Sequence, residues 1–353
     1  MWYVGIDLHG YYMITAARKQ GERMRPTRIE NQDREKIRDY FTSLGDFKAV
    51  IEASGTYMWL YDMLKELGGE VVIAHPLKLK AIGSAKVKTD KIDSKMLAKL
   101  LEGDLIPCSY VPAEKYRSLR DITRYRCRMV RQRTLMRNRL SYILLKKNVA
   151  SPYKNKFCKQ GKKWFREQEW GETDNFQRDQ LLDILEMLGT KIEATNEKLE
   201  EISENFPEVA VLQELSGIGL YTALVIIGEI AEPERFRSAD QVSGYTGLCA
   251  RVSQSGKHCY HGHITREGSA WLRWVLVEAA LKLVRKDQWF KRFYQRIRKR
   301  RGKHVARIAT ARKLVRICWH RLIKYRNNVS DFTPGWQRTY VMGAVSARYE
   351  GLR

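Results

Sequence analysis

The first hundred residues alternate short apolar runs with longer segments in which apolar residues recur at helical spacing, the pattern of an α/β domain. The apolar runs predict buried strands, at 2–7, 47–52 and 70–74. The helical spacing predicts three helices, at 33–44, 57–67 and 90–102. Two further candidate strands form a hairpin, at 11–18 and 23–30. Because the strands at 47–52 and 70–74 flank a helix, we expect them to pair in parallel.

Beyond Pro107 and Pro112 the pattern becomes mostly helical. Residues 114–147 predict a long basic helix or a pair of helices, and residues 148–176, which combine lysines with proline and glycines, predict an irregular connector. A second globular region of mostly α structure is expected from residue 206. The predicted organisation has four segments: 1–112, 113–205, 206–326 and a tail at 327–353.

A heptad repeat follows the connector, with positions spaced alternately four and three residues apart and interrupted only by one threonine. Its members are Leu181, Leu185, Leu188, Ile192, Thr195, Leu199 and Ile202. Such a coiled-coil helix could pair antiparallel with another helix of the same chain, join two copies of the chain, or cover one of the basic helices.

The chain is strongly basic, with 65 Lys and Arg against 40 Asp and Glu, a formal net charge of +25 and a pI near 9.8. Residues 114–147 hold 12 basic and two acidic residues, and residues 285–326 hold 17 basic residues and one acid. Solvated helix faces usually mix the two signs, so these stretches favour contact with nucleic-acid phosphates. Gly217 and Gly219 form a turn between predicted helices that resembles the helix-hairpin-helix module. The candidate nucleic-acid contacts are Arg124, Arg128, Arg131, Gly217, Gly219, Lys257, Arg273, Arg298 and Arg301.

Several classes of protein are excluded by composition. A hydrophobic fraction of 44% with nine Trp and 18 Tyr argues against a largely disordered chain. No apolar run reaches the roughly 18 residues of a membrane span, and the N-terminus lacks the basic segment of a signal peptide. Six cysteines without paired spacing predict reduced thiols in a cytoplasmic protein.

Four carboxylates carry the candidate chemistry. Asp7 and Glu52 each end an apolar strand, and Asp90 and Asp93 lie three residues apart on one helix face. Clustered acids can hold two divalent ions roughly 4 Å apart around a scissile phosphate, and all-oxygen ligands suit Mg²⁺. The alternative for Asp90 and Asp93 is helix capping. Asp7 is harder to explain without a partner, because an acid at the end of an apolar strand is costly.

A second cluster lies in the loop at 244–269, which is rich in Gly, Ser, Lys and His. Ser255, followed by Gly256 and Lys257, would suit a hydroxyl nucleophile on a mobile loop beside a cation, although Ser-Gly is also ordinary turn chemistry. Cysteines and histidines in the loop raise the alternative of a zinc site, but their spacing matches no zinc motif: Cys249, His258, Cys259, His261 and His263.

Five motifs in order along the chain resemble the insertion sequence 110 family of transposases, the DEDD-type recombinases. They are Val4-Gly-Ile-Asp-Leu-His9, Ile51-Glu-Ala-Ser-Gly-Thr-Tyr57, the stretch from His75-Pro76 to Lys88-Thr-Asp-Lys-Ile-Asp-Ser-Lys-Met-Leu-Ala98, Leu215-Ser-Gly-Ile-Gly219 and Ser255-Gly256. The likeness spans residues 4 to about 320. Two regions depart from it: Cys249-Ala250 replaces the Thr-Pro of many relatives, and residues 148–176 align poorly with shorter members.

The resemblance implies a RuvC-like (RNase H-like) N-terminal domain and a helical C-terminal transposase domain. By motif match, Asp7, Glu52, Asp90 and Asp93 take the metal-binding carboxylate positions, for Mg²⁺ or Mn²⁺, and Ser255 takes the position of a nucleophile that forms a phosphoserine link. The family's elements carry a noncoding bridge RNA that pairs with donor and target DNA, so the implied partners are both DNAs, that RNA and further copies of the chain, as a dimer or tetramer. A prokaryotic, nucleoid-associated protein is expected.

Because the serine and the carboxylates belong to different predicted domains, the active site could be shared between protomers. Two other activities stay open from the residues: a hydrolytic RuvC-like nuclease or junction resolvase, which needs only the carboxylates, and a site-specific DNA invertase that works without RNA. An inactive nucleic-acid-binding relative is a further alternative.

Overall fold

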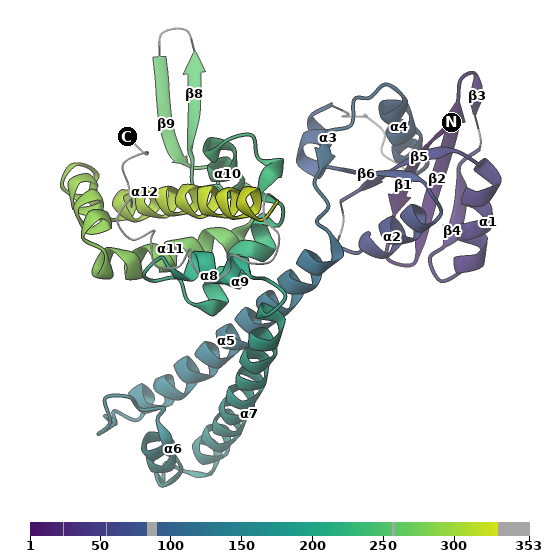
Figure 1. Cartoon of the computed structure of the whole chain (residues 1–353). Helices are drawn as coiled ribbons and strands as arrows, with labels where there is room; N and C mark the ends of the chain where they lie inside the picture. The colour runs from purple at the N-terminus through teal and green to yellow at the C-terminus, as the bar shows by residue number, and fades with distance from the viewer. Residues whose placement is uncertain (24, 54, 83–89, 256–257, 331–353) are drawn as a thin grey trace. The chain divides into compact units, whose positions relative to one another are not determined.

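The structure, a computed structural model, describes the chain except residues 24, 54, 83–89, 256–257 and 331–353. It divides into two compact units, Met1–Val111 and Pro112–Arg353 (Figure 1). The first unit is a mixed α/β structure and the second is mostly helical, as the sequence predicts. Among the described residues, no helix combines the length and the apolar character needed to cross a membrane.

The first unit is built on one mixed sheet with the strand order β3-β2-β1-β5-β6-β7, in which β4 also pairs with β2. Its strands are β1 (Trp2–Leu8), β2 (Tyr12–Lys19), β3 (Glu22–Arg23), β4 (Thr27–Glu30), β5 (Phe47–Glu52), β6 (Glu70–Ala74) and β7 (Cys108–Ser109). Strand β1 pairs antiparallel with β2 and parallel with β5, and β5 pairs parallel with β6. The expected parallel pairing is confirmed. The predicted hairpin is present, but two short strands, β3 and β4, replace its single second strand.

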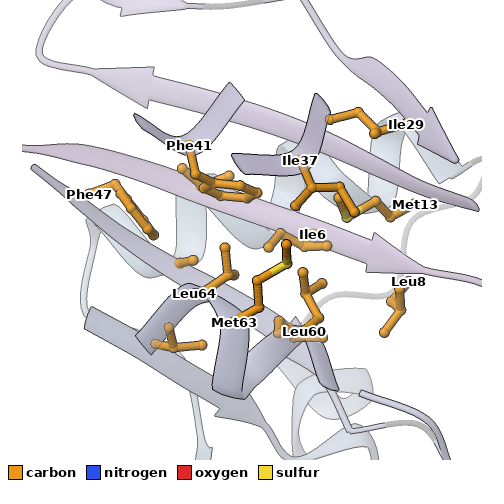
Figure 2. Close-up of a cluster of buried hydrophobic side chains, with 14 of the residues drawn as sticks. Ile6, Leu8, Met13, Ile29, Ile37, Phe41, Phe47, Leu60, Met63 and Leu64 are labelled. Atoms are coloured by element: carbon orange, nitrogen blue, oxygen red, sulfur yellow. The ribbon is translucent and has the colours of Figure 1, made fainter. Parts of the chain in front are cut away.

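One face of the sheet carries the main core, beneath α1 (Arg34–Leu44) and α2 (Met58–Glu66). Alternate residues of a strand face opposite sides, so Val4, Ile6 and Leu8 of β1 enter this core together. Figure 2 shows Ile6 among Phe41, Met63 and other buried side chains of the two helices. The short α3 (Pro76–Ile82) follows β6.

Helix α4 (Asp90–Glu102) packs over the side chains on the other face of the sheet, with Leu97 and Leu101 against Val50. It lies directly on β1 at Gly5, where a Cβ would stand 2.1 Å from the carbonyl oxygen of Ser94 and 2.4 Å from the amide nitrogen of Ala98. Because residues 5 and 7 share one face of the strand, this close approach brings the first turn of α4 beside Asp7.

We expect Gly5→Ala to destabilise the first unit by about 1–3 kcal/mol or more, because the added methyl overlaps backbone atoms that cannot rotate away. Alanine is otherwise no worse than glycine in a strand, so the loss would report the clash. Hydrogen exchange of peptides from Met1–Val111 measures the effect. Gly10→Ala is the matched control, since a Cβ there meets nothing within 4 Å. Equal exchange in the two variants would show that α4 does not pack tightly on β1.

The second unit begins with two long helices, α5 (Glu114–Lys146) and α7 (Glu172–Ser203), which run antiparallel. Arg126 Nε donates to Asn196 Oδ1 at 2.6 Å near one end of the pair, and Lys146 Nζ lies 3.0 Å from Asp174 at the other. Of the two alternatives for residues 114–147, the structure shows the single helix, α5. The heptad positions from Leu185 to Leu199 are buried within this chain, as the intrachain alternative predicts.

The prediction of an irregular connector at 148–176 is wrong in part, because α6 (Lys159–Arg166) and the first turn of α7 lie within it. Phe165 is fully buried, with its ring centroid 5.9 Å from that of Phe157 and 5.4 Å from that of Trp164. These aromatic residues bury enough apolar surface to order the segment between the ends of α5 and α7. The lysines and glycines of the segment conceal that signal in the sequence.

The remaining helices of the second unit are α8 (Glu208–Gln213), α9 (Leu220–Ile230), the 3₁₀ turn η1 (Pro233–Arg235), α10 (Ala239–Tyr245), α11 (Ala270–Lys286) and α12 (Gln288–Ser330). Helix α9 is apolar on nearly every side and is correspondingly buried. Helix α12 is interrupted at Gly302, whose φ of 80° is not helical. The predicted tail begins inside α12, and its residues 331–353 lie outside the described chain.

The loop predicted at 244–269 is only partly irregular. Strands β8 (Ala250–Ser255) and β9 (His258–Ile264) form an antiparallel hairpin within it, with a register shift between Ala250 and Val252. The hairpin follows α10 and precedes α11. None of the described residues of the hairpin is buried, and Val252 is 60% and Tyr260 71% exposed, so the sequence carries no alternation of buried and exposed positions that would predict a strand.

Candidate active site and nucleic-acid interface

Two of the predicted carboxylates meet beside His9. Asp7 stands near the end of β1 and Asp90 is the first residue of α4. The Nε2 of His9 lies 3.3 Å from Asp7 Oδ2 and 3.2 Å from Asp90 Oδ2. One ligand atom from each of the three residues lies within 4.8 Å of the other two, a spacing that could hold a metal ion. Among the described residues, no other group of three acid, His or Cys side chains converges in this way.

The electrostatics of this cluster are those of crowded negative charge. Burial raises the pKa of Asp7 above its usual value, and the neighbouring carboxylates Asp90 and Asp93 raise it further, while His9 lowers it. The Asp7 side chain is 18% exposed, so water solvates its charge only in part. A divalent cation would relieve both the burial of this charge and its repulsion by Asp90 and Asp93.

The other two predicted carboxylates lie nearby but outside this group of three. Asp93 belongs to the first turn of α4 and is close enough to raise the pKa of Asp7. Glu52 ends β5, the parallel neighbour of β1, and stands one residue beyond the paired residues Ile6 and Ile51. It shares the α4 side of the sheet with Val50, because alternate residues share a face. The Glu52 side chain itself is exposed.

Neither His9 nor Tyr12 was predicted from the sequence to belong to this site. The Tyr12 hydroxyl donates to Asp90 Oδ2 at 3.1 Å, and this hydrogen bond raises the pKa of Tyr12. The Tyr12 ring lies 4.7 Å from that of His9, and the Arg28 guanidinium lies 3.8 Å from the Tyr12 ring centroid. One signal was present: His9 follows Asp7 by two residues, the spacing that puts extended residues on one side.

The predicted nucleophile Ser255 is the last residue of β8, where the backbone register pairs it with His258 of β9. Lys257 lies outside the described residues. Gly217 and Gly219 form the turn between α8 and α9, as predicted. Gly217 has a φ of +108°, and a Cβ there would stand 3.0 Å from the Leu283 amide nitrogen of α11. Packing and backbone conformation therefore both explain this glycine.

The predicted arginine contacts fall into two groups. Three interact within the chain: Arg124 pairs with the buried Glu229 at 2.7 Å, Arg131 lies 4.6 Å from the Trp271 ring centroid, and Arg273 donates to the carbonyl oxygen of Thr246 at 2.9 Å. The other three are exposed: Arg128, Arg298 and Arg301. The last two belong to a basic run next to the Gly302 interruption of α12, which leaves their charges available to a polyanion.

Comparison with known proteins gives two family matches. A model of DEDD-type IS110 transposases matches residues 4–148, and a model described as "Transposase IS116/IS110/IS902 family" matches residues 209–295. The chain is 26% identical over 311 residues to a putative transposase y4qE of Sinorhizobium fredii, covering 85% of this chain and 74% of the relative. It is 22% identical over 311 residues to the transposase for the insertion sequence element IS1111A of Coxiella burnetii, covering 81% of each.

A third relative, a probable family 20 transposase of Pseudomonas aeruginosa, is 25% identical over 301 residues, covering 81% of this chain and 87% of that protein. Together these matches define an enzyme that acts on DNA, a transposase. The chain belongs to the IS110 family of transposases.

Proposed function

We propose that this transposase cuts and rejoins donor and target DNA under the guidance of a noncoding bridge RNA, using a divalent-metal carboxylate site and a serine nucleophile. The observation that carries the proposal is the meeting of Asp7 and Asp90, which come from distant parts of the sequence and converge through the close packing of α4 on β1. Folding would bring two acids together beside a half-buried histidine at some energetic cost, which a bound cation repays.

We assign the first unit to the RuvC-like (RNase H-like) fold. The mixed sheet supports this assignment, because its first strands pair antiparallel while β1, β5 and β6 pair in parallel. The carboxylates Asp7 and Glu52 lie near the ends of the two neighbouring parallel strands, where a substrate can approach beyond the sheet.

The donor set fits a hard divalent cation. Asp7, Glu52, Asp90 and Asp93 offer carboxylate oxygens, and the pKa of Asp7 is raised first by burial and then by the nearby carboxylates Asp90 and Asp93. In this role the four carboxylates would hold Mg²⁺ or Mn²⁺. The ion supplies charge stabilisation at the scissile phosphate. Tyr12 would keep Asp90 oriented through its hydrogen bond.

Ser255 is the proposed nucleophile. Its hydroxyl oxygen forms a bond to the scissile phosphorus as the bond from phosphorus to the 3′ oxygen breaks, and the serine proton passes to a base while the leaving oxygen is protonated. The phosphoserine link preserves the energy of the broken bond, so the exchanged strand can be joined without ATP. His258 is the backbone register partner of Ser255 in the hairpin, and we propose it as the candidate base for this proton.

The proposed partners follow from charge. The exposed arginines of α12, among them Arg298 and Arg301, would contact the phosphates of DNA and of the bridge RNA. Base pairing by the RNA would supply the sequence specificity. Assembly as a dimer or tetramer would bring donor and target DNA together.

A hydrolytic nuclease or junction resolvase is the second candidate, since the cluster of Asp7, His9 and Asp90 is complete within the first unit. Such an enzyme would need no serine. A DNA invertase that uses no RNA is a variant of the main proposal.

The experiment that tests RNA guidance is purification of the protein from cells that carry the gene with its flanking DNA, followed by sequencing of the bound RNA. We expect one discrete RNA encoded in the flank. Cells that carry the coding sequence alone are the control and should yield no such species. Heterogeneous RNA from both preparations would contradict guidance and favour the invertase or nuclease, because a basic surface binds any RNA.

A further inference from the structure

The Nε2 atom of His9 lies between the two carboxylates of the acidic cluster. This nitrogen is closed off from solvent and has no hydrogen-bond partner with suitable geometry among the described residues. The same atom nevertheless lies 3.3 Å from Asp7 Oδ2 and 3.2 Å from Asp90 Oδ2. A nitrogen that is shut off from water and faces two carboxylate oxygens at these distances is arranged like one ligand of a cation that all three atoms share.

The distances fit a shared ion. Neighbouring ligands of an octahedral cation, each about 2.1 Å from the metal, stand about 3.0 Å apart. The two separations from Nε2 are close to this value. Nitrogen and oxygens are therefore spaced like adjacent ligands around one ion.

The surroundings hold the imidazole in this orientation. The backbone of His9 is fixed on both sides, because its amide donates to the Tyr12 carbonyl oxygen at 2.9 Å and its own carbonyl oxygen accepts from Asn31 Nδ2 at 2.8 Å. The His9 ring packs against the Tyr12 ring, and the Tyr12 hydroxyl donates to Asp90. One tyrosine thus orients two members of the cluster, as residues around metal ligands often do.

We propose that His9 supplies a nitrogen ligand to the divalent ion held by Asp7 and Asp90, and that this mixed donor set makes the site select Mn²⁺ over Mg²⁺. Mg²⁺ strongly prefers oxygen ligands, whereas transition-metal ions accept imidazole nitrogen together with carboxylates. The inference rests on the proposed function only in requiring that a divalent ion binds at Asp7 and Asp90.

The test uses the full chain, freed of nucleic acid by high salt. The protein is titrated with Mn²⁺, with Mg²⁺ as competitor, and bound Mn²⁺ is observed by continuous-wave and pulsed electron paramagnetic resonance. We expect Mn²⁺ to bind at least about tenfold more tightly than Mg²⁺. The Mn²⁺ spectrum of the wild-type protein should show modulation from a directly bound imidazole ¹⁴N nucleus. His9→Ala should abolish this modulation and weaken Mn²⁺ binding about tenfold or more, with Mg²⁺ affinity changed less than about threefold.

Two variants accompany His9→Ala. His304→Ala, which removes an exposed histidine of α12, should keep both the nitrogen signal and the Mn²⁺ affinity. His9→Gln retains side-chain bulk in case the alanine variant fails to fold, and should lose the imidazole signal. Mn²⁺ binding without a nitrogen signal, and unchanged by loss of His9, would overturn the inference and leave the metal-dependent function standing. Failure of the wild-type chain to bind either ion would overturn both.

Discussion

Ser255→Ala is expected to abolish strand transfer while DNA binding stays within about twofold of wild type. Loss of a catalytic serine in a covalent mechanism costs on the order of 10⁶-fold, below the detection limit of a recombination assay. The wild-type protein should form a covalent adduct with DNA that survives denaturation, and the variant should form none. Both are measured with end-labelled DNA on a denaturing gel.

Ser253→Ala is the matched control, because Ser253 is another serine of the same strand β8, two residues earlier. It should recombine at a rate near that of wild type. If Ser255→Ala still cuts DNA in the presence of a divalent ion, the protein is a hydrolytic nuclease and the serine has no catalytic role.

The parts of the fold that follow from local pattern were predictable. Apolar runs at Phe47–Glu52 and Glu70–Ala74 gave parallel strands, and the acids at strand and helix ends pointed to the cluster of Asp7 and Asp90. Their convergence could not be read from spacing alone. It depends on Gly5, where the absence of a side chain lets α4 approach β1, and nothing local marks that glycine as a packing contact.

The sequence was least informative where tertiary contacts override local composition. Helix α6 forms among lysines and glycines because Phe165 and its aromatic neighbours are buried there. Arg124 belongs to a basic run, yet it pairs with Glu229, a carboxylate 105 residues away. His9 lies in the motif whose aspartate is the predicted ligand, and its contact with Asp90 forms only on folding. The role of Ser255 likewise does not follow from its backbone position in the hairpin, because a nucleophile also needs a base and a bound phosphate.

Asp7→Asn is expected to make the protein more stable and inactive at once. The folded-state pKa of Asp7 is raised by burial and by Asp90 and Asp93, so the folded state binds the Asp7 proton more tightly than the unfolded state does. Stability therefore falls as pH rises from the unfolded value near 3.8 through the raised folded pKa, and the full cost remains at neutral pH. Asparagine carries no charge and removes this cost, so without divalent ions the Tm at pH 7 should rise.

The pH dependence and the metal response separate this explanation from a simple packing effect. The gain in Tm should shrink toward zero below about pH 3.8, where Asp7 is protonated in both folded and unfolded states. Added Mn²⁺ or Mg²⁺ should raise the Tm of the wild-type protein, because an ion that binds only the folded state stabilises it, and should raise that of Asp7→Asn far less. Strand transfer by the variant should fall at least about a hundredfold. Burial and the repulsion of Asp90 and Asp93 make the charge of Asp7 costly, and binding a cation is the function that would explain why the charge is kept. A variant that is less stable at neutral pH, or that responds to the ions as the wild type does, would therefore contradict a cation-binding role for Asp7.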